Sequence, residues 1–243
     1  MRRYAPSSVP PRLAPGARPL LVAPHGRGRP GTRPWGTHPR TTNGTTPMNL
    51  AEQRAHILTG AMYDDLTPEL VAAREATVLR TNEYNATFGR PPAEREALLA
   101  TLLAAVGTGV HFEPTFRCEF GYNITIGSNF YANFDCVMLD GAPITIGDNV
   151  LLGPRVGIFT SNHALDPVER VNGACYAKPV TIGDNVWIGG HVTINQGVTI
   201  GAGSVIGSGS VVTRDIPPGV IAAGVPARVL RPITSADSTG WKP

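Results

Sequence analysis

The chain has 243 residues, a formal net charge of +3, and 28 glycines with 23 prolines. It contains no run of about 18 apolar residues, so the sequence predicts no membrane-spanning helix. The three cysteines are odd in number and lack metal-ligand spacing, which predicts reduced, packed thiols, no metal site and a cytoplasmic protein. They are Cys118, Cys136 and Cys175.

The basic charge lies in the first 47 residues. This segment holds eight arginines and no acidic residue, whereas the remainder has 13 basic against 18 acidic residues. The segment is rich in Pro and Gly and has no apolar period, so we expect residues 1–47 to be a disordered extension ahead of Met48. Because the rest of the chain is acidic, no nucleic-acid partner is predicted.

Residues 48–107 are expected to form three short helices. Apolar residues recur at helical intervals over residues 48–62. Thr67 followed by Pro68 is typical of a helix start, with Thr as N-cap and Pro at the first helical position, and this helix should run to about Phe88. A third helix should begin near Pro92. The residues expected on its apolar face are Leu98, Leu99, Leu102, Leu103 and Val106.

Residues 180–216 repeat in steps of six. One position of each step holds a β-branched apolar residue: Ile182, Ile188, Ile194, Ile200, Ile206 and Val212. A second position, four residues later, holds small or β-branched residues: Val186, Val192, Val198, Ser204 and Ser210. An amphipathic helix has a period near 3.6, so the pattern favours a solenoid of short strands instead. The branched residues would fill its interior, and the following Gly or Asn would let the backbone turn a corner.

The six-residue step begins more weakly at Ile126, so residues 108–233 are expected to form the solenoid and residues 234–243 a disordered tail. Residues 160–179 interrupt it with the string SNHALDPVERVNGACYAK, which has no hexapeptide register. A long excursion from a regular solenoid is either a tolerated insertion or a functional loop. His163 stands where the loop leaves the coil, which favours a functional loop.

Several stretches are similar to those of a known family: HFEPTFRCEFGYNITIG, NFYANFDCVMLD, SNHALDPVER, KPVTIGDNVWIGGH and IPPGVIAAGVPARVL. They resemble the hexapeptide-repeat sugar O-acetyltransferases of the maltose and galactoside types, and the resemblance runs from about Leu50 to Ile233. It implies a mainly β protein, a left-handed parallel β-helix preceded by a short α-helical segment. It also implies a homotrimer with active sites between subunits, and acetyl-CoA as co-substrate.

The resemblance assigns residues to the site. His163 takes the position of the family's catalytic base, and an imidazole can accept the proton of a sugar hydroxyl and return it to the departing thiolate. The positions implied for acceptor binding are Asp65, Glu119, Tyr131 and Asn133. Those implied for coenzyme A are Gly190, Ser208, Thr213, Arg214, Arg228 and Arg231. Glu119 stands where galactoside enzymes carry a serine, which favours a glucose or maltose type of acceptor.

Other interpretations stay open. An enzyme of the same fold could acetylate an antibiotic, a serine hydroxyl or a signalling oligosaccharide. A γ-type carbonic anhydrase needs three histidine ligands for zinc, and only His163 and His191 lie in the appropriate region. A non-enzymatic structural solenoid would have an unbroken repeat. Asp166 or Glu169 could orient His163, whereas His191 is expected at a corner of the coil and Trp187 on the surface.

Overall fold

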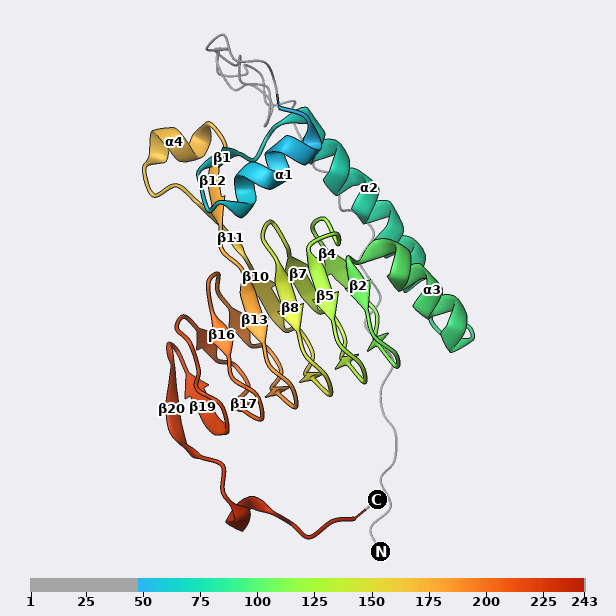
Figure 1. The fold of residues 1–243 in the computed structure, drawn as a ribbon, viewed down its shortest axis with the longest axis vertical. Helices are drawn as coiled ribbons and strands as arrows, with labels where there is room; N and C mark the ends of the chain where they lie inside the picture. Colours follow the sequence, from blue (N-terminus) through green and yellow to red (C-terminus); the bar gives the residue numbers. More distant parts are fainter. Residues whose placement is uncertain (1–47, 243) are drawn as a thin grey trace, which may run out of the picture. The chain divides into compact units, whose positions relative to one another are not determined.

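The computed structural model describes residues 48–242 (Figure 1), so the predicted extension over residues 1–47 lies outside the described residues. Four elements precede the solenoid: α1 (Leu50–Leu58), β1 (Tyr63–Asp64), α2 (Pro68–Asn85) and α3 (Pro92–Leu102). From there to β20 the chain is a coil of short parallel strands. The parallel β-helix with helices before it is therefore confirmed. Within residues 48–242, no helix is both long enough and apolar enough to cross a membrane.

Three sheets run along the solenoid, and the chain visits them in turn. Sheet I contains β2 (Ala105–Val106), β5 (Ile124–Ile126), β8 (Ile144–Ile146), β13 (Val180–Ile182) and β16 (Thr199–Ile200). Sheet II contains β3 (His111–Phe112), β6 (Tyr131–Ala132), β9 (Leu151–Leu152), β14 (Trp187–Ile188), β17 (Val205–Ile206), β19 (Val220–Gly224) and β20 (Ala227–Pro232). Sheet III contains β4 (Arg117–Cys118), β7 (Val137–Leu139), β10 (Gly157–Phe159), β15 (Thr193–Ile194) and β18 (Val211–Val212). Only β19 and β20 pair antiparallel among these strands.

The interior of the solenoid is built from the residues that the six-residue period selects. Every residue in the two predicted sets of interior positions, from Ile182 to Val212, is at most 2% exposed. Burying one β-branched side chain contributes about 1.5–3 kcal/mol, and each coil repeats that contribution. The two interior serines keep their hydroxyls satisfied, since Ser204 donates to the carbonyl of Pro217 and Ser210 to that of Gly207.

Asparagine and glycine serve different purposes at the corners. Asn129, Asn149 and Asn185 have φ values of 57°, 56° and 58° between sheets I and II, a left-handed conformation that Asn tolerates. Their side-chain amides form a ladder, with Nδ2–Oδ1 distances of 3.1 Å at each step. A Cβ on Gly127 would lie 2.7 Å from the carbonyl carbon of Gly147 in the next coil. Asn therefore turns the corner, and Gly lets successive coils stack closely.

The helical segment agrees with the predicted starts and differs in its ends. Thr67 caps α2, its hydroxyl accepting from the Leu70 amide at 3.3 Å, which confirms that start. The prediction that Val106 belongs to the third helix was wrong, because α3 ends at Leu102. Val106 lies in β2 and pairs with Ile126, so the first coil already begins at residue 105.

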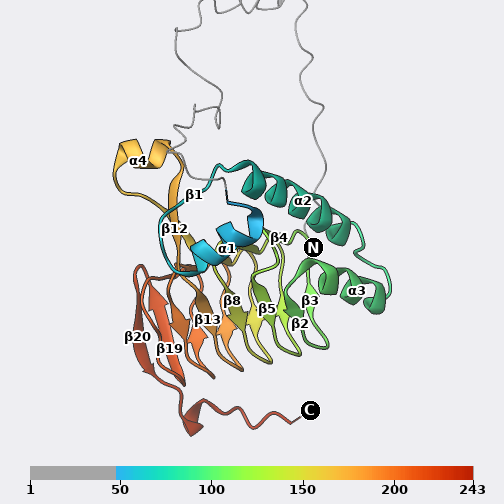
Figure 2. The same ribbon diagram turned by 45° about the horizontal axis from the view of Figure 1, so that its top comes forward.

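The helices pack against the solenoid at its first coil and along one of its edges. Tyr84 of α2 packs edge-on against Phe112 and Phe116, which closes the first coil from one end. Figures 1 and 2 both show α3 beside β2 and α1 beside β12. A second, smaller apolar cluster covers the edge between sheets III and I. Its buried members are Ile57, Tyr63, Leu70, Phe120, Ala142, Cys175 and Ala177.

The interruption of the repeat is a folded excursion from the edge between sheets III and I. It contains β11 (Ser161–His163), α4 (Pro167–Val171) and β12 (Ala174–Ala177), with β11 and β12 antiparallel. β12 also pairs with β1, so the helical segment holds the excursion from its other side. After β20, the described part of the expected tail contains the short 3₁₀ helix Ser235–Asp237.

Candidate functional site

His163 is presented by a small antiparallel sheet. Strand β12 lies between β1 and β11, and its Cys175 is the register partner of both Tyr63 and His163. Side chains directly opposite one another in such a sheet point to the same face, so these three form one row. His163 is exposed at the end of β11, and its ring makes no hydrogen bond to the described residues. It is therefore open to a substrate.

The carboxylate expected to orient His163 has another partner. Asp166 is the N-cap of α4, and its Oδ1 accepts from the amides of Val168 and Glu169 at 2.8 and 2.9 Å. Both carboxylates suggested by the sequence, Asp166 and Glu169, lie in exposed positions on the excursion. The orientation of β11 instead follows from its pairing with β12.

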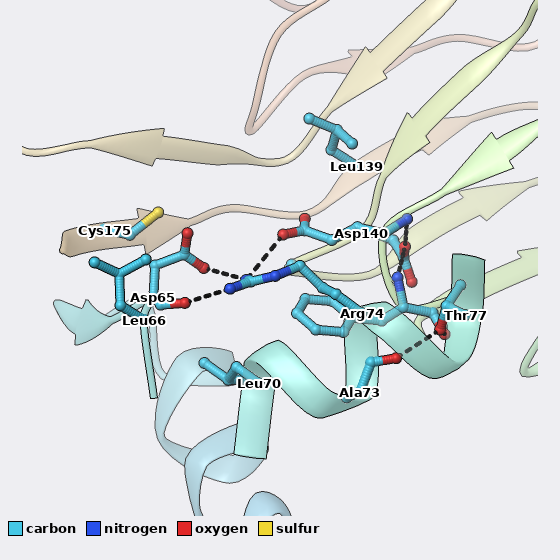
Figure 3. Close-up of polar contacts among 12 residues, drawn as sticks. Asp65, Leu66, Leu70, Ala73, Arg74, Thr77, Leu139, Asp140 and Cys175 are labelled. Carbon is cyan, nitrogen blue, oxygen red and sulfur yellow. Dashed lines mark hydrogen bonds and ion pairs between the residues drawn. The ribbon is translucent and has the colours of Figure 1, made fainter. Parts of the chain in front are cut away.

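Arg74 of α2 contacts two of the predicted acceptor residues, and Figure 3 shows its contact with one of them, Asp65. Its Nη1 lies 2.7 Å from Oδ1 of Asp65 and 3.4 Å from Oε1 of Glu119, and its Nη2 donates to the Asp65 backbone carbonyl. Asp65 follows β1 and Glu119 follows β4, so the two carboxylates are 54 positions apart in sequence. Sequence reasoning missed Arg74. No local pattern in the sequence singles it out, because its two partners come from distant segments of the chain.

Glu119 is the least well satisfied carboxylate of this group. Its side chain is 13% exposed, and its Oε2 is buried without a hydrogen-bond partner in the described chain. Burial, followed by the charge of Asp65, raises the pKa of Glu119 to about 7, although Arg74 opposes the shift. Nearby Asp140 is fully buried and accepts three backbone amides, from Glu119, Phe120 and Asn123. Asp140 thus fixes the turn that carries Glu119.

Cys175, the central residue of the row that contains His163, lies near the same carboxylates. Burial is the main cause that raises the pKa of Cys175 to about 11, and the charges of Asp65 and Glu119 add to it. Burial also raises the pKa of the Tyr63 hydroxyl, which faces Cys175 and Ser161. A buried thiol with a raised pKa is a poor nucleophile. All three cysteines are free and buried, as predicted.

The remaining two predicted acceptor residues lie at a different edge. Tyr131 is in β6, and Asn133 follows it at the edge between sheets II and III. The Tyr131 hydroxyl donates to Glu113 at 3.3 Å, and its ring stacks on His111 with 5.8 Å between centroids. One side of the coil separates this edge from the one that carries Glu119 and His163, a distance of roughly 15–20 Å. Within one chain, the acceptor residues therefore form two groups.

The predicted coenzyme A residues lie in the later coils. Some are on the edge between sheets II and III, and others are on the edge between sheets III and I. Gly190 and Ser208 stand on the same edge as Asn133, beside His191, which has φ 58° and so confirms its expected corner position. Thr213 and Arg214 follow β18 at the edge of His163 and are exposed.

The two remaining predicted coenzyme A residues, Arg228 and Arg231, lie on the exposed strand β20. The Arg231 guanidinium is held by both carboxylate oxygens of Asp237, at 2.8 and 2.7 Å. This pairing fixes the direction of the guanidinium. Among residues 48–242, no group of three His, Cys, Asp or Glu side chains has an arrangement that could hold a metal ion.

Comparison with known proteins gives three family matches. Residues 56–107 match the maltose acetyltransferase hexapeptide capping motif, residues 143–161 the hexapeptide repeat of succinyl-transferase, and residues 179–214 the bacterial transferase hexapeptide of six repeats. A putative acetyltransferase of Saccharomyces cerevisiae is 48% identical over 76% of this chain and 94% of its own length. The chain belongs to the hexapeptide-repeat acetyltransferase family.

Solved structures of this acetyltransferase family have the same architecture. A maltose O-acetyltransferase from Clostridium difficile 630 superposes with a TM-score of 0.73 at 45% identity, covering 77% of this chain and 99% of that one. A galactoside acetyltransferase in complex with coenzyme A also gives 0.73 at 44% identity, covering 76% of this chain and 92% of that one. The capping motif of the family spans Tyr63, Asp65 and Arg74, the residues that connect the helical segment to the His163 sheet.

Proposed function

We propose that this acetyltransferase transfers the acetyl group of acetyl-CoA to a hydroxyl of a sugar of the glucose or maltose type, with His163 as general base. The observation that carries the proposal is the position of His163, which is exposed at the end of β11 opposite Cys175, a residue that feels the charges of Asp65 and Glu119. The maltose and galactoside relatives, both acetyltransferases by name, support a sugar acceptor.

The chemistry needs one base and correct positioning. The neutral imidazole of His163 takes the proton of the acceptor hydroxyl as its oxygen forms a bond to the thioester carbonyl carbon. The carbon–sulfur bond then breaks, and the imidazolium returns the proton to the thiolate, so the products are an acetyl ester and a free thiol. The buried cysteines take no part in this direct transfer. Positioning both substrates accounts for much of the remaining rate enhancement.

Acceptor recognition combines the two groups of polar residues. Asp65, Arg74 and Glu119 offer acceptors and donors on the same edge of the solenoid as His163, which suits a ligand rich in hydroxyl groups. Tyr131 and Asn133 are too far away along the same chain to touch that ligand. A neighbouring subunit that places its own edge between sheets II and III against this site would bring both groups to one acceptor. We therefore infer that the site lies between subunits.

The outward faces of the solenoid support such an assembly. Sheet I carries four exposed threonines in register: Thr125, Thr145, Thr181 and Thr199. Sheet II carries an apolar row, in which Leu151 and Trp187 are 48% and 54% exposed. Sheet III carries Val137, Leu139 and Phe159 outward. Two apolar faces allow each subunit to contact two neighbours head to tail, which closes a ring such as a homotrimer.

For acetyl-CoA, the described residues supply suitable contacts. Gly190 and Ser208 are small residues at an open edge, which lets a pantetheine arm pass beside the coil. Arg214, Arg228 and Arg231 are exposed and can meet phosphate groups through their guanidinium N–H donors. Thr213 is the first residue after β18 and comes directly before Arg214 in the chain. Bound there, acetyl-CoA would supply the activated acetyl group.

Thiol release tests the proposal. The purified protein is mixed with acetyl-CoA and a panel of maltose, glucose, isopropyl thiogalactoside, serine and chloramphenicol. We expect release stimulated by glucose or maltose, and loss of ~10²–10⁴-fold in turnover in His163→Ala, the usual cost of removing a general base. Full turnover in that variant would overturn the mechanism, and release with serine or chloramphenicol alone would overturn the acceptor class. A mass in solution of three times 25.7 kDa is expected for the homotrimer.

A further inference from the structure

The site around Arg74 contains three carboxyl groups, but a single guanidinium in the described chain pairs with them. Asp65, Glu119 and Asp140 lie together, and Arg74 is the one guanidinium that pairs with any of them among the described residues. Arg54 of α1 is near, but its guanidinium lies 3.8 Å from the centre of the Tyr122 ring and forms no ion pair there. Three ionised carboxylates in this partly buried space would repel one another strongly, so one of them is expected to keep its proton.

The hydrogen bonds identify which carboxyl group that is. Asp140 accepts three backbone N–H donors at 2.8–3.2 Å, and these donors favour its ionised form against the burial that raises its pKa. Asp65 receives the shortest contact of Arg74, at 2.7 Å. Glu119 receives only the longer contact of 3.4 Å, and its buried Oε2 has no partner in the described chain. An ionised oxygen left unpaired in a buried position is costly, whereas a protonated one carries a donor for a ligand.

We propose that Glu119 is neutral in the free site and donates its proton in a hydrogen bond to an oxygen of the acceptor, so that acceptor binding requires the protonated carboxyl group. The proposal rests on the sugar O-acetyltransferase function above. A sugar hydroxyl or ring oxygen supplies the lone pair that this donor needs. A carboxyl group in this role favours acceptors that present an oxygen beside Arg74, and it discriminates against those that present an N–H or an apolar group there.

The surroundings of Glu119 decide the pH range. Burial and the charge of Asp65 raise its pKa to about 7, with Asp140 adding to the shift and Arg74 opposing it. The titratable and charged groups that face it come from β4, from the edge after β7, from the segment around β1 and α2, and from β12. They are Cys118, Asp140, Tyr122, Asp65, Arg74 and Cys175. Burial also raises the pKa values of the two thiols, of the Tyr122 phenol and of Asp140, while the raised pKa of Glu119 lies near neutrality, at about 7.

The donor role of Glu119 predicts a pH dependence of acceptor use. It requires a neutral carboxyl group and is lost as pH rises through the pKa of Glu119. The kcat/KM for the acceptor should therefore fall on the alkaline side of its pH profile, and Glu119 is responsible for this alkaline limb.

The first test needs no acceptor. A carboxyl group with a raised pKa in the folded state favours folding below its unfolded pKa of about 4.3, and this contribution disappears as pH rises through the folded value. Glu119→Gln removes the ionisation, so the Tm of the variant relative to wild type should rise between about pH 4 and about pH 8 and stay level above that. Glu75→Gln, at an exposed position on the same helix as Arg74, is the matched control and should show a constant difference. A constant difference for Glu119→Gln would overturn the proposal.

The second test measures the pH profile with the acceptor that gives thiol release. Glutamine retains a donor that does not titrate, so Glu119→Gln should lose the alkaline limb and leave the KM for acetyl-CoA unchanged. An alkaline limb that persists in the variant would overturn the donor role. Absence of release with every acceptor of the panel would contradict the proposed function and the acceptor bond with it, while the denaturation series would still report the proton on Glu119.

Discussion

The regular coils and the excursion at residues 160–179 are built on different rules. Between Val180 and Ile216 each strand repeats the one before it, and every inward side chain meets its counterpart one coil away. The excursion has no such repeated row. Its strands run antiparallel, its helix α4 buries no residue, and Leu165 is 90% exposed, although Cys175 and Ala177 of β12 pack into the second apolar cluster. The repeated apolar burial is therefore concentrated in the coils.

The excursion is nevertheless fixed in place, and by a distant part of the chain. β12 pairs on one side with β11 and on the other with β1, which lies about a hundred positions earlier. The same N-terminal segment delivers Asp65 and Arg74 to Glu119. The helical segment thus completes the site as well as covering an edge of the solenoid. A functional loop on a repeat fold needs such an external support, since the repeat itself cannot specify its conformation.

The largest expected effect on stability comes from the coils. Ile194→Ala removes a fully buried side chain between Ile158 and Val212, and should lower the free energy of unfolding by about 2–5 kcal/mol. Denaturant unfolding at one fixed protein concentration measures this. The control Thr181→Ala alters the exposed face of sheet I in the same coil and should stay within about 0.5 kcal/mol of wild type.

His163→Ala should match that control in stability, because the ring makes no hydrogen bond to the described chain. The same variant is expected to lose most of its turnover. A loss of stability as large as that of Ile194→Ala would show that the excursion belongs to the cooperative core, and the contrast between the two regions would fail.

A smaller effect is expected where the helical segment meets the site. Lysine in place of Arg74 keeps the charge but cannot reach both Oδ1 and the backbone carbonyl of Asp65 in a planar fork. Hydrogen bonds to charged groups contribute about 1.5–3 kcal/mol, so the acceptor KM of Arg74→Lys should rise roughly 10–100-fold. Steady-state kinetics should show an unchanged KM for acetyl-CoA. Arg80→Lys, on the same helix but bonded only to the Thr101 carbonyl, is the control. An equal rise in both KM values would indicate a general disturbance of the fold.

Local periodicity explains how much of this structure could be predicted. Interior positions, the exposed Trp187 and the corner at His191 all follow from a rule that repeats every six residues. Contacts between remote segments follow no such rule. The helix after Pro92 ends at Leu102 because Val106 finds a strand partner in the next coil. Arg74 and Asp237 are likewise placed by ion pairs that a single sequence does not reveal.

The smallest effect on the free energy of unfolding should come from substitutions at the corners. These substitutions separate the contribution of the left-handed backbone from that of the amide ladder. Asn149 has φ 56°, and it both accepts an amide bond from Asn129 and donates one to Asn185. Asn149→Ala loses the ladder and must also hold a left-handed conformation, which costs a residue with a Cβ roughly 1–2 kcal/mol. Asn149→Gly loses the same ladder without that strain. In denaturant unfolding, Ala should therefore be less stable than Gly by about 1 kcal/mol. Equal stability of the two variants would mean that the amide ladder, rather than the backbone conformation, selects asparagine at this corner.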